Sequence, residues 1–128
     1  MDSNKTKDEK VQDYYNLSLT YFESARVSLE KELFEPAMFN AIHALELALK
    51  AALLTKRSDV WKTHNIGGFF SKLFMDEVGR EDCRRINVIL SKYNLPRYPG
   101  IASLDPDEVR EDIEFIEHFI KVVVPSLL

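Results

Sequence analysis

The longest apolar segment of the chain spans residues 37–54 and reads AMFNAIHALELALKAALL. It is rich in alanine and leucine, which are strong helix formers, and it contains no glycine or proline. At 100° per residue, its four polar side chains fall within about a third of the helix circumference. They are Asn40, His43, Glu46 and Lys50. Because a surface helix has a narrower apolar face than this, the pattern predicts a central helix with other helices around most of it.

The polar stripe on this helix has two interpretations. It can be a strip left open to water, in which Glu46 and Lys50 form an i,i+4 pair. It can instead face a partner molecule or a cleft. The sequence leaves both interpretations open.

A second helical period precedes the central helix. Residues 10–32 place Tyr14, Leu17, Tyr21, Ala25 and Leu29 close to one face, whereas residues 1–9 are polar and predicted to be disordered. Pro36 is suited to the first turn of a helix, so it marks the start of the central one. Because the connection is short, the first two helices should form an antiparallel αα-hairpin.

Two further helices are predicted in the second half of the chain. The first spans 66–78, with Thr63 or Asn65 as its N-cap and Gly79 just after its end. The second spans 81–93 and has Cys83 on its apolar face. The following segment, 94–104, contains two prolines and a glycine, so it cannot be regular helix.

The last helix has a clear start. Asp105 is placed as N-cap, Pro106 at the first helical position and Glu108 at the third. Pro125 is expected to end this helix. The whole pattern predicts an all-α fold: an up-and-down bundle of about five helices, formed by 1–128 as a single domain.

Composition narrows the class of protein. The chain has 128 residues, and its one cysteine, Cys83, permits neither an internal disulfide nor a cysteine metal site. No run of 18 apolar residues and no signal-peptide core occurs, so we expect a cytoplasmic protein without a membrane span. The net charge of −4 gives no overall attraction for nucleic acid, which would need a local basic patch. Nothing in the sequence indicates a metal or another cofactor.

Four motifs together resemble the HEPN family, the small helical domains of higher eukaryotes and prokaryotes that were proposed to bind nucleotides. They are a tyrosine-rich first helix followed by the break at 34–36, the HALELALKAALL segment at 43–54, the Lys-Thr-His-Asn-Ile segment at 62–66, and Tyr93 followed by Pro-Arg-Tyr-Pro at 96–99. They span nearly the whole chain. The resemblance implies a helical bundle that forms a homodimer. It also implies pairing with a minimal nucleotidyltransferase in a toxin–antitoxin-like system.

Catalytically active relatives are metal-independent RNases that use an arginine and a histidine with four to six residues between them. In this chain Arg57 and His64 have that spacing, and they are the catalytic candidates. They precede the third predicted helix rather than occupying the usual helical position, and Arg110 and His118 are one residue too far apart. The resemblance therefore predicts little or no RNA cleavage.

Three other residues are candidates for ligand binding: Lys62, Arg97 and Tyr98. A guanidinium binds phosphate in a bidentate manner, and Pro96 and Pro99 stiffen the backbone around Arg97. Because loops alternate between the ends of an antiparallel bundle, we expect these residues to join Arg57 and His64 in one shallow cleft.

Each candidate also has a structural interpretation. His64 can cap a helix, Arg97 can form a salt bridge, and the cluster of Arg80, Arg84 and Arg85 can be a solvated face. Three functions stay open: a nucleotide- or RNA-binding partner of a nucleotidyltransferase, an RNase toxin, and a non-catalytic protein-interaction module.

Overall fold

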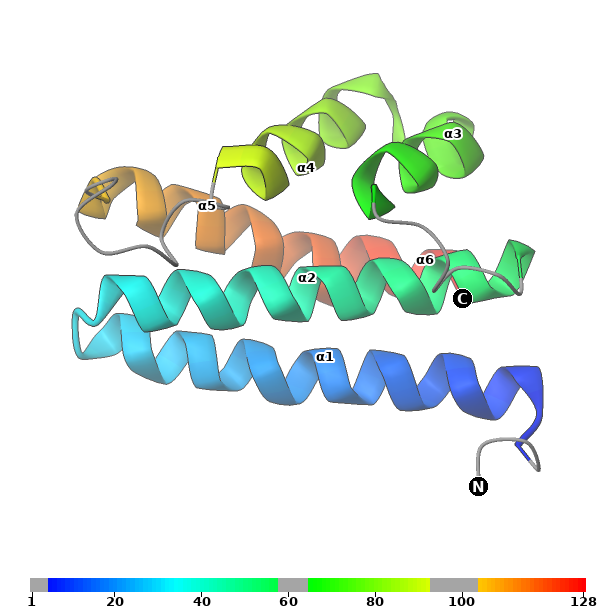
Figure 1. Ribbon diagram of the computed structural model, residues 1–128, viewed down its shortest axis with the longest axis horizontal. Coiled ribbons are helices and arrows are strands. Elements are labelled where there is room, and N and C mark those ends of the chain that lie inside the picture. The colour runs from blue at the N-terminus through cyan, green and yellow to red at the C-terminus, as the bar shows by residue number, and fades with distance from the viewer. Residues whose placement is uncertain (1–4, 58–64, 93–103) are drawn as a thin grey trace.

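The computed structural model describes residues 5–57, 65–92 and 104–128. Within these ranges the chain is all-α, as predicted, and contains no strand. The helices are α1 (Lys7–Glu30), α2 (Phe34–Lys56), α3 (Ile66–Val78), α4 (Arg80–Lys92) and α5 (Pro106–His118), and the last continues through η4 (Phe119–Val123) into α6 (Val124–Leu127). Figure 1 shows α1 and α2 as a long antiparallel hairpin, with α5 behind them and α3 and α4 to one side.

The α1–α2 hairpin is confirmed, and cross-helix contacts fix its register. Asn40 donates a hydrogen bond to the Ser24 hydroxyl at 3.3 Å, and the Tyr21 and His43 rings meet edge to face at 4.4 Å between centroids. The turn requires Glu32 to adopt a left-handed backbone with φ of 59°, a rare conformation for a residue with a side chain.

The prediction that α2 is the central helix is confirmed. Its buried side chains are mainly alanine and leucine, and they face α1, α3, α5 and α6. Leu45, Leu49 and Leu53 are completely buried, and each contributes about 1.5–3 kcal/mol of transfer free energy. The intervening buried alanines are small, so neighbouring helices can approach α2 closely.

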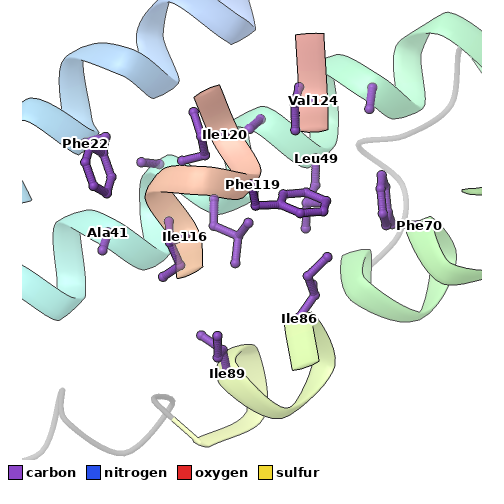
Figure 2. Packing of buried hydrophobic residues seen from close by; sticks show 14 of the residues in the cluster. Phe22, Ala41, Leu49, Phe70, Ile86, Ile89, Ile116, Phe119, Ile120 and Val124 are labelled. Carbon is purple, nitrogen blue, oxygen red and sulfur yellow. The ribbon is translucent and has the colours of Figure 1, made fainter. Parts of the chain in front are cut away.

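The rest of the core comes from the second half of the chain. Figure 2 shows Ile86 and Ile89 of α4 below the C-terminal helix, and Phe70 of α3 facing Phe119. The Phe70 and Phe119 ring centroids lie 5.9 Å apart and nearly perpendicular, a favoured aromatic geometry. The α3–α4 pair is thereby packed against α2 and η4 by apolar burial.

Two helix starts differ from the sequence prediction. Helix α1 begins at Lys7, because the Thr6 hydroxyl accepts a hydrogen bond from the Glu9 amide and caps the first turn. Residues 7–9 are therefore helical, whereas 1–4 lie outside the described residues. Helix α2 begins at Phe34, so Pro36 lies inside the first turn, where its missing N–H is not needed.

The expected stop at Pro125 is wrong. Helix α6 includes this proline, and the five-residue π-helical segment Phe119–Val123 precedes it. In a regular α-helix the proline ring would clash with the carbonyl four residues earlier. Here the Val124 amide bonds to the Phe119 carbonyl, five residues back, and the wider turn lets the helix continue through the proline.

Helix α2 is long and apolar enough to cross a membrane by composition, but 72% of its most apolar window is buried inside the chain. Burial of that kind is typical of a core helix. No other helix in the described ranges passes the same test.

Candidate functional site

Arg57 is the one predicted site residue that the described part of the chain contains. It follows the last residue of α2 with an extended backbone, and its amide donates a 2.8 Å hydrogen bond to the Leu53 carbonyl. Its guanidinium carbon lies 5.4 Å from the centre of the Phe69 ring in α3, within cation–π range. Arg57 is exposed and Phe69 half-buried, so a cation and an aromatic surface meet at this corner.

The other predicted site residues lie outside the described residues. These are His64 and Lys62, before α3, and Arg97 and Tyr98, between α4 and α5. Their roles, including the catalytic pairing of Arg57 with His64, stay predictions.

The neighbouring cation, Lys56, has a structural role. Its ammonium nitrogen donates to the Leu73 carbonyl at 2.8 Å and to the Glu77 carboxylate at 2.6 Å, and it lies 4.3 Å from the Phe74 ring centre. The hydrogen bond from Lys56 lowers the pKa of Glu77. Lys56 thus ties the end of α2 to α3 and helps to hold the Arg57–Phe69 corner in place.

The glycines at the start of α3 serve packing. Asn65, one of the two residues predicted as N-cap, caps the helix by accepting a hydrogen bond from the Gly68 amide. A Cβ atom added to Gly67 would lie 2.5 Å from the Asn87 side-chain oxygen in α4, so a larger residue there would displace the Asn87 side chain. Asn87 also donates hydrogen bonds to the Ser71 hydroxyl at 2.8 Å and to the Cys83 carbonyl at 2.9 Å. Gly67 therefore allows α3 and α4 to pack closely.

The predicted arginine cluster is divided between two faces of α4. Arg80 and Arg84 are exposed, and among the described residues Arg84 makes a long 3.8 Å pair with Glu81. Arg85 turns toward α5, where its guanidinium carbon lies 4.5 Å from the Phe115 ring centre. The cluster is therefore not a single basic patch.

A buried carboxylate in α5, which the sequence analysis missed, holds α4 to α5. Asp112 is 5% exposed and lies 3.0 Å from the Lys92 ammonium and 3.6 Å from the Arg85 guanidinium. Burial acts to lower the pKa of Lys92, but the hydrogen bonds that Lys92 donates to Glu108 and Asp112 outweigh it and raise that pKa. The position of Asp112 in the sequence could have indicated this burial, because it falls on the otherwise apolar stripe of Val109, Ile113 and Ile116.

The start of α5 lies at the α1–α2 turn. The Arg110 guanidinium is 3.9 Å from Glu32 and lies over the Phe34 ring, and Lys92 pairs with Glu108 one turn earlier. Arg57 lies at the opposite end of α2, about 34 Å along the 23-residue helix. The residues that flank 93–103 are thus remote from the Arg57 corner within one chain (Figure 1). The alternation of loops between the ends of a bundle predicted that they would lie close to it. The difference arises because α3 and α4 have only 13 residues each and are shorter than α2.

The remaining titratable candidates have structural surroundings. His43 packs on Tyr21, and His118 is exposed at the edge of a shallow groove with Arg85 and Phe115. Cys83 is buried, and burial raises the pKa of its thiol, so it is no activated nucleophile. Within the described ranges no three His, Cys, Asp or Glu side chains are grouped as metal ligands.

Comparison with protein families gives a match to the HEPN domain over residues 11–127. Comparison with curated proteins and with solved structures gives no match. The matched segment runs from the first turns of α1 to the last residue of α6 and includes the Arg57–Phe69 corner. The chain therefore belongs to the HEPN family of helical domains, whose roles concern nucleotides and RNA.

Proposed function

We propose that this chain is a cytoplasmic, homodimeric HEPN protein that binds a nucleotide or a short RNA. It acts with a minimal nucleotidyltransferase as a toxin–antitoxin-like pair. The observation that carries the binding part is the Arg57–Phe69 corner in a chain of this family.

The corner offers the two groups that a nucleotide needs. A guanidinium can bind a phosphate through two parallel hydrogen bonds. A nearby aromatic face can stack a base without regard to its sequence. Lys62 and His64, in the connection between Arg57 and α3, add a second cation and an imidazole that titrates near neutral pH.

A homodimer agrees with the positions of the two segments that carry predicted ligand residues. The flanks of 93–103 and the Arg57 corner lie near opposite ends of α2 in one chain. A copy related by a two-fold axis and running antiparallel would bring the Arg57 end of one protomer to the Lys92 end of its partner. In that arrangement Arg97 and Tyr98 would complete the site from the second protomer.

We expect this site to bind rather than to cleave. A metal-independent RNase would need Arg57 and His64 as a working pair, and their positions before α3 differ from those in active relatives. If the wild-type protein cleaved RNA robustly, and both Arg57→Ala and His64→Ala abolished cleavage, the RNase alternative would replace the present proposal.

Titration calorimetry with a panel of nucleotides and a short single-stranded RNA tests the binding part. We expect wild type to bind at least one of them and Arg57→Ala to bind it about 5- to 150-fold more weakly, the equivalent of about 1–3 kcal/mol for a lost charge-assisted hydrogen bond. Arg80→Ala is the matched control, because Arg80 is also an exposed arginine next to a helix end. Equal binding by wild type and Arg57→Ala would reject the corner as the site.

A second result would reject nucleotide or RNA binding altogether. If wild type binds no ligand at millimolar concentration, where only about 4 kcal/mol of affinity is required, the chain is a protein-interaction module. The pairing with a nucleotidyltransferase is tested separately, by co-expression of the two proteins and purification through a tag on one of them.

A further inference from the structure

One long face of the α1–α2 hairpin has no helix packed on it among the described residues. Helix α2 contributes His43, Glu46 and Lys50, which are spaced by three and four residues and so lie in one line. Helix α1 contributes Leu17 and Tyr21, one turn apart beside that line. We call these five residues the hairpin face. In Figure 1 α1 and α2 lie in front, with α5 behind them.

The register of the hairpin places Leu17 at the centre of this face. The Tyr21–His43 contact and the Asn40–Ser24 hydrogen bond pair residues whose numbers sum to 64. By the same sum Leu17 is level with position 47, which lies between Glu46 and Lys50. Leu17 is 46% exposed. An exposed apolar group is therefore flanked by one negative and one positive charge.

The face carries two charges of opposite sign. Glu46 and Lys50 are both half-buried, yet neither forms an ion pair or a hydrogen bond with any residue in the described ranges. Some half-buried charges here are paired, as Lys92 is with Asp112, whereas Lys10 and Asp82 have no ion pair among the described residues. Half-buried charges without a partner lose hydration and gain nothing in return. Their position favours an external partner of complementary charge.

We infer that the hairpin face binds the same face of a second copy of this chain. The two-fold axis passes between Glu46 and Lys50, so that each Glu46 meets Lys50 of the partner subunit. In a two-fold interface, residue i contacts residue j and j contacts i, so one arrangement pairs all four charges. Leu17 and Tyr21 lie beside the axis and form the apolar and aromatic centre that such interfaces favour. This inference rests on the homodimer of the proposed function and assigns its surface.

The side of the α1–α2 hairpin that carries this face is large enough for an interface. A helix of 23 residues is about 34 Å long, and two helices side by side are about 20 Å wide. The product, about 700 Å² for each protomer, is close to the roughly 800 Å² that a stable interface buries on each partner.

Charge reversal gives a sharp test, with sedimentation velocity at several concentrations as the measurement. Glu46→Lys and Lys50→Glu each place like charges at both symmetric contacts. Each should raise the dissociation constant of the dimer at least tenfold. An equimolar mixture of the two variants should form a heterodimer, because both contacts are then Lys–Glu pairs. The doubly substituted chain should dimerise like wild type.

Matched controls come from α3. Lys72→Glu and Asp76→Lys reverse exposed charges that have no ion pair in the described part of the chain, and they should leave the dimer unchanged. Circular dichroism and thermal unfolding of each variant report that the helices are intact. Native mass spectrometry of the mixture identifies the heterodimer by its intermediate mass.

The contrary outcomes are distinct. If wild type is a dimer and the single variants dimerise as tightly, or if the mixture forms no heterodimer, the hairpin face is not the interface and the homodimer stands. If wild type is a monomer throughout, the interface and the homodimer fail together. The nucleotide or RNA binding of the Arg57 corner is then judged by its own titration.

Discussion

The Tyr15 hydroxyl donates a 2.9 Å hydrogen bond to the backbone carbonyl of Ile120, which lies 105 positions later in the chain. Ile120 belongs to the π-helical segment, where an amide bonds to the carbonyl five residues earlier. The amide five residues after Ile120 would be that of Pro125, which has no N–H. Tyr15 therefore supplies the donor that the proline removes, and it ties α1 to the C-terminal helix.

Tyr15→Phe should lower the free energy of unfolding by about 1–3 kcal/mol, because it leaves a partly buried carbonyl without a donor. Urea unfolding followed by circular dichroism measures the change. If the proline is the cause, the cost should shrink in a Pro125→Ala background, where an N–H is restored. A double-mutant cycle in which the two changes are strictly additive would contradict this coupling.

Ionisation of Tyr15 should also lower the stability of the protein at alkaline pH. Burial raises the pKa of Tyr15 above its ordinary value near 10, although Lys121 acts in the opposite direction. Between that value and the raised pKa, the unfolded chain has lost the proton while the folded chain keeps it. The stabilising contribution is thus complete below about pH 10 and lost as pH rises through the folded pKa.

Unfolding experiments from pH 8 to 11 test this sign. Wild type should lose more stability than Tyr15→Phe over the upper part of the range. Parallel curves for the two proteins would show that Tyr15 has the same pKa in both states.

Gly67→Ala should destabilise the protein, although alanine is the better helix former by about 1 kcal/mol. The new Cβ would lie 2.5 Å from the Asn87 oxygen and 2.9 Å from a Leu90 methyl carbon, so the Asn87 side chain, which is hydrogen-bonded to Ser71 and Cys83, and the Leu90 side chain would have to shift. Overpacking of this kind costs about 1–3 kcal/mol. A thermal melt compares the variant with Gly68→Ala, whose Cβ meets only the Asn65 cap side chain. Equal or higher stability of Gly67→Ala would contradict the packing argument.

Asp112→Asn should detach the start of α5 from α4. The amide keeps the size of the carboxylate but leaves Lys92 and Arg85 without their buried counter-charge. We expect a loss of about 1–3 kcal/mol, below the range for a fully buried pair because Lys92 is partly exposed. Denaturant unfolding measures it, with Glu114→Gln on the exposed face of α5 as control. A loss equal to that of the control would show that the ion pairs contribute nothing.

Local signals in the sequence predicted most of the helices. The apolar periods, Asn65 as a cap, Gly79 with φ of 97° and Pro106 in the first turn all define helices that the structure contains. These signals act within one turn of the chain, so a single sequence is sufficient to read them. The capping hydroxyl of Thr6 was of the same kind and was overlooked.

The differences arise where distant residues decide the outcome. Pro125 does not end its helix, because a π turn and the hydroxyl of Tyr15, from the other end of the chain, accommodate it. Asp112 is buried because Lys92 and Arg85 reach it from α4. For the site, the sequence placed Arg57 correctly at the end of α2. The surface it shares with Phe69 depends on how α3 packs, which the pattern alone does not give.

The most direct measurement of the central claim is a backbone amide NMR titration of the labelled protein with the RNA or nucleotide used in calorimetry. If the Arg57 corner is the site, shifts should concentrate at Arg57, Asn65 and Phe69, with further shifts in 93–103 if the second protomer completes it. Residues of the Arg85–His118 groove should not change. Shifts confined to that groove, or no shifts with millimolar ligand, would contradict the account.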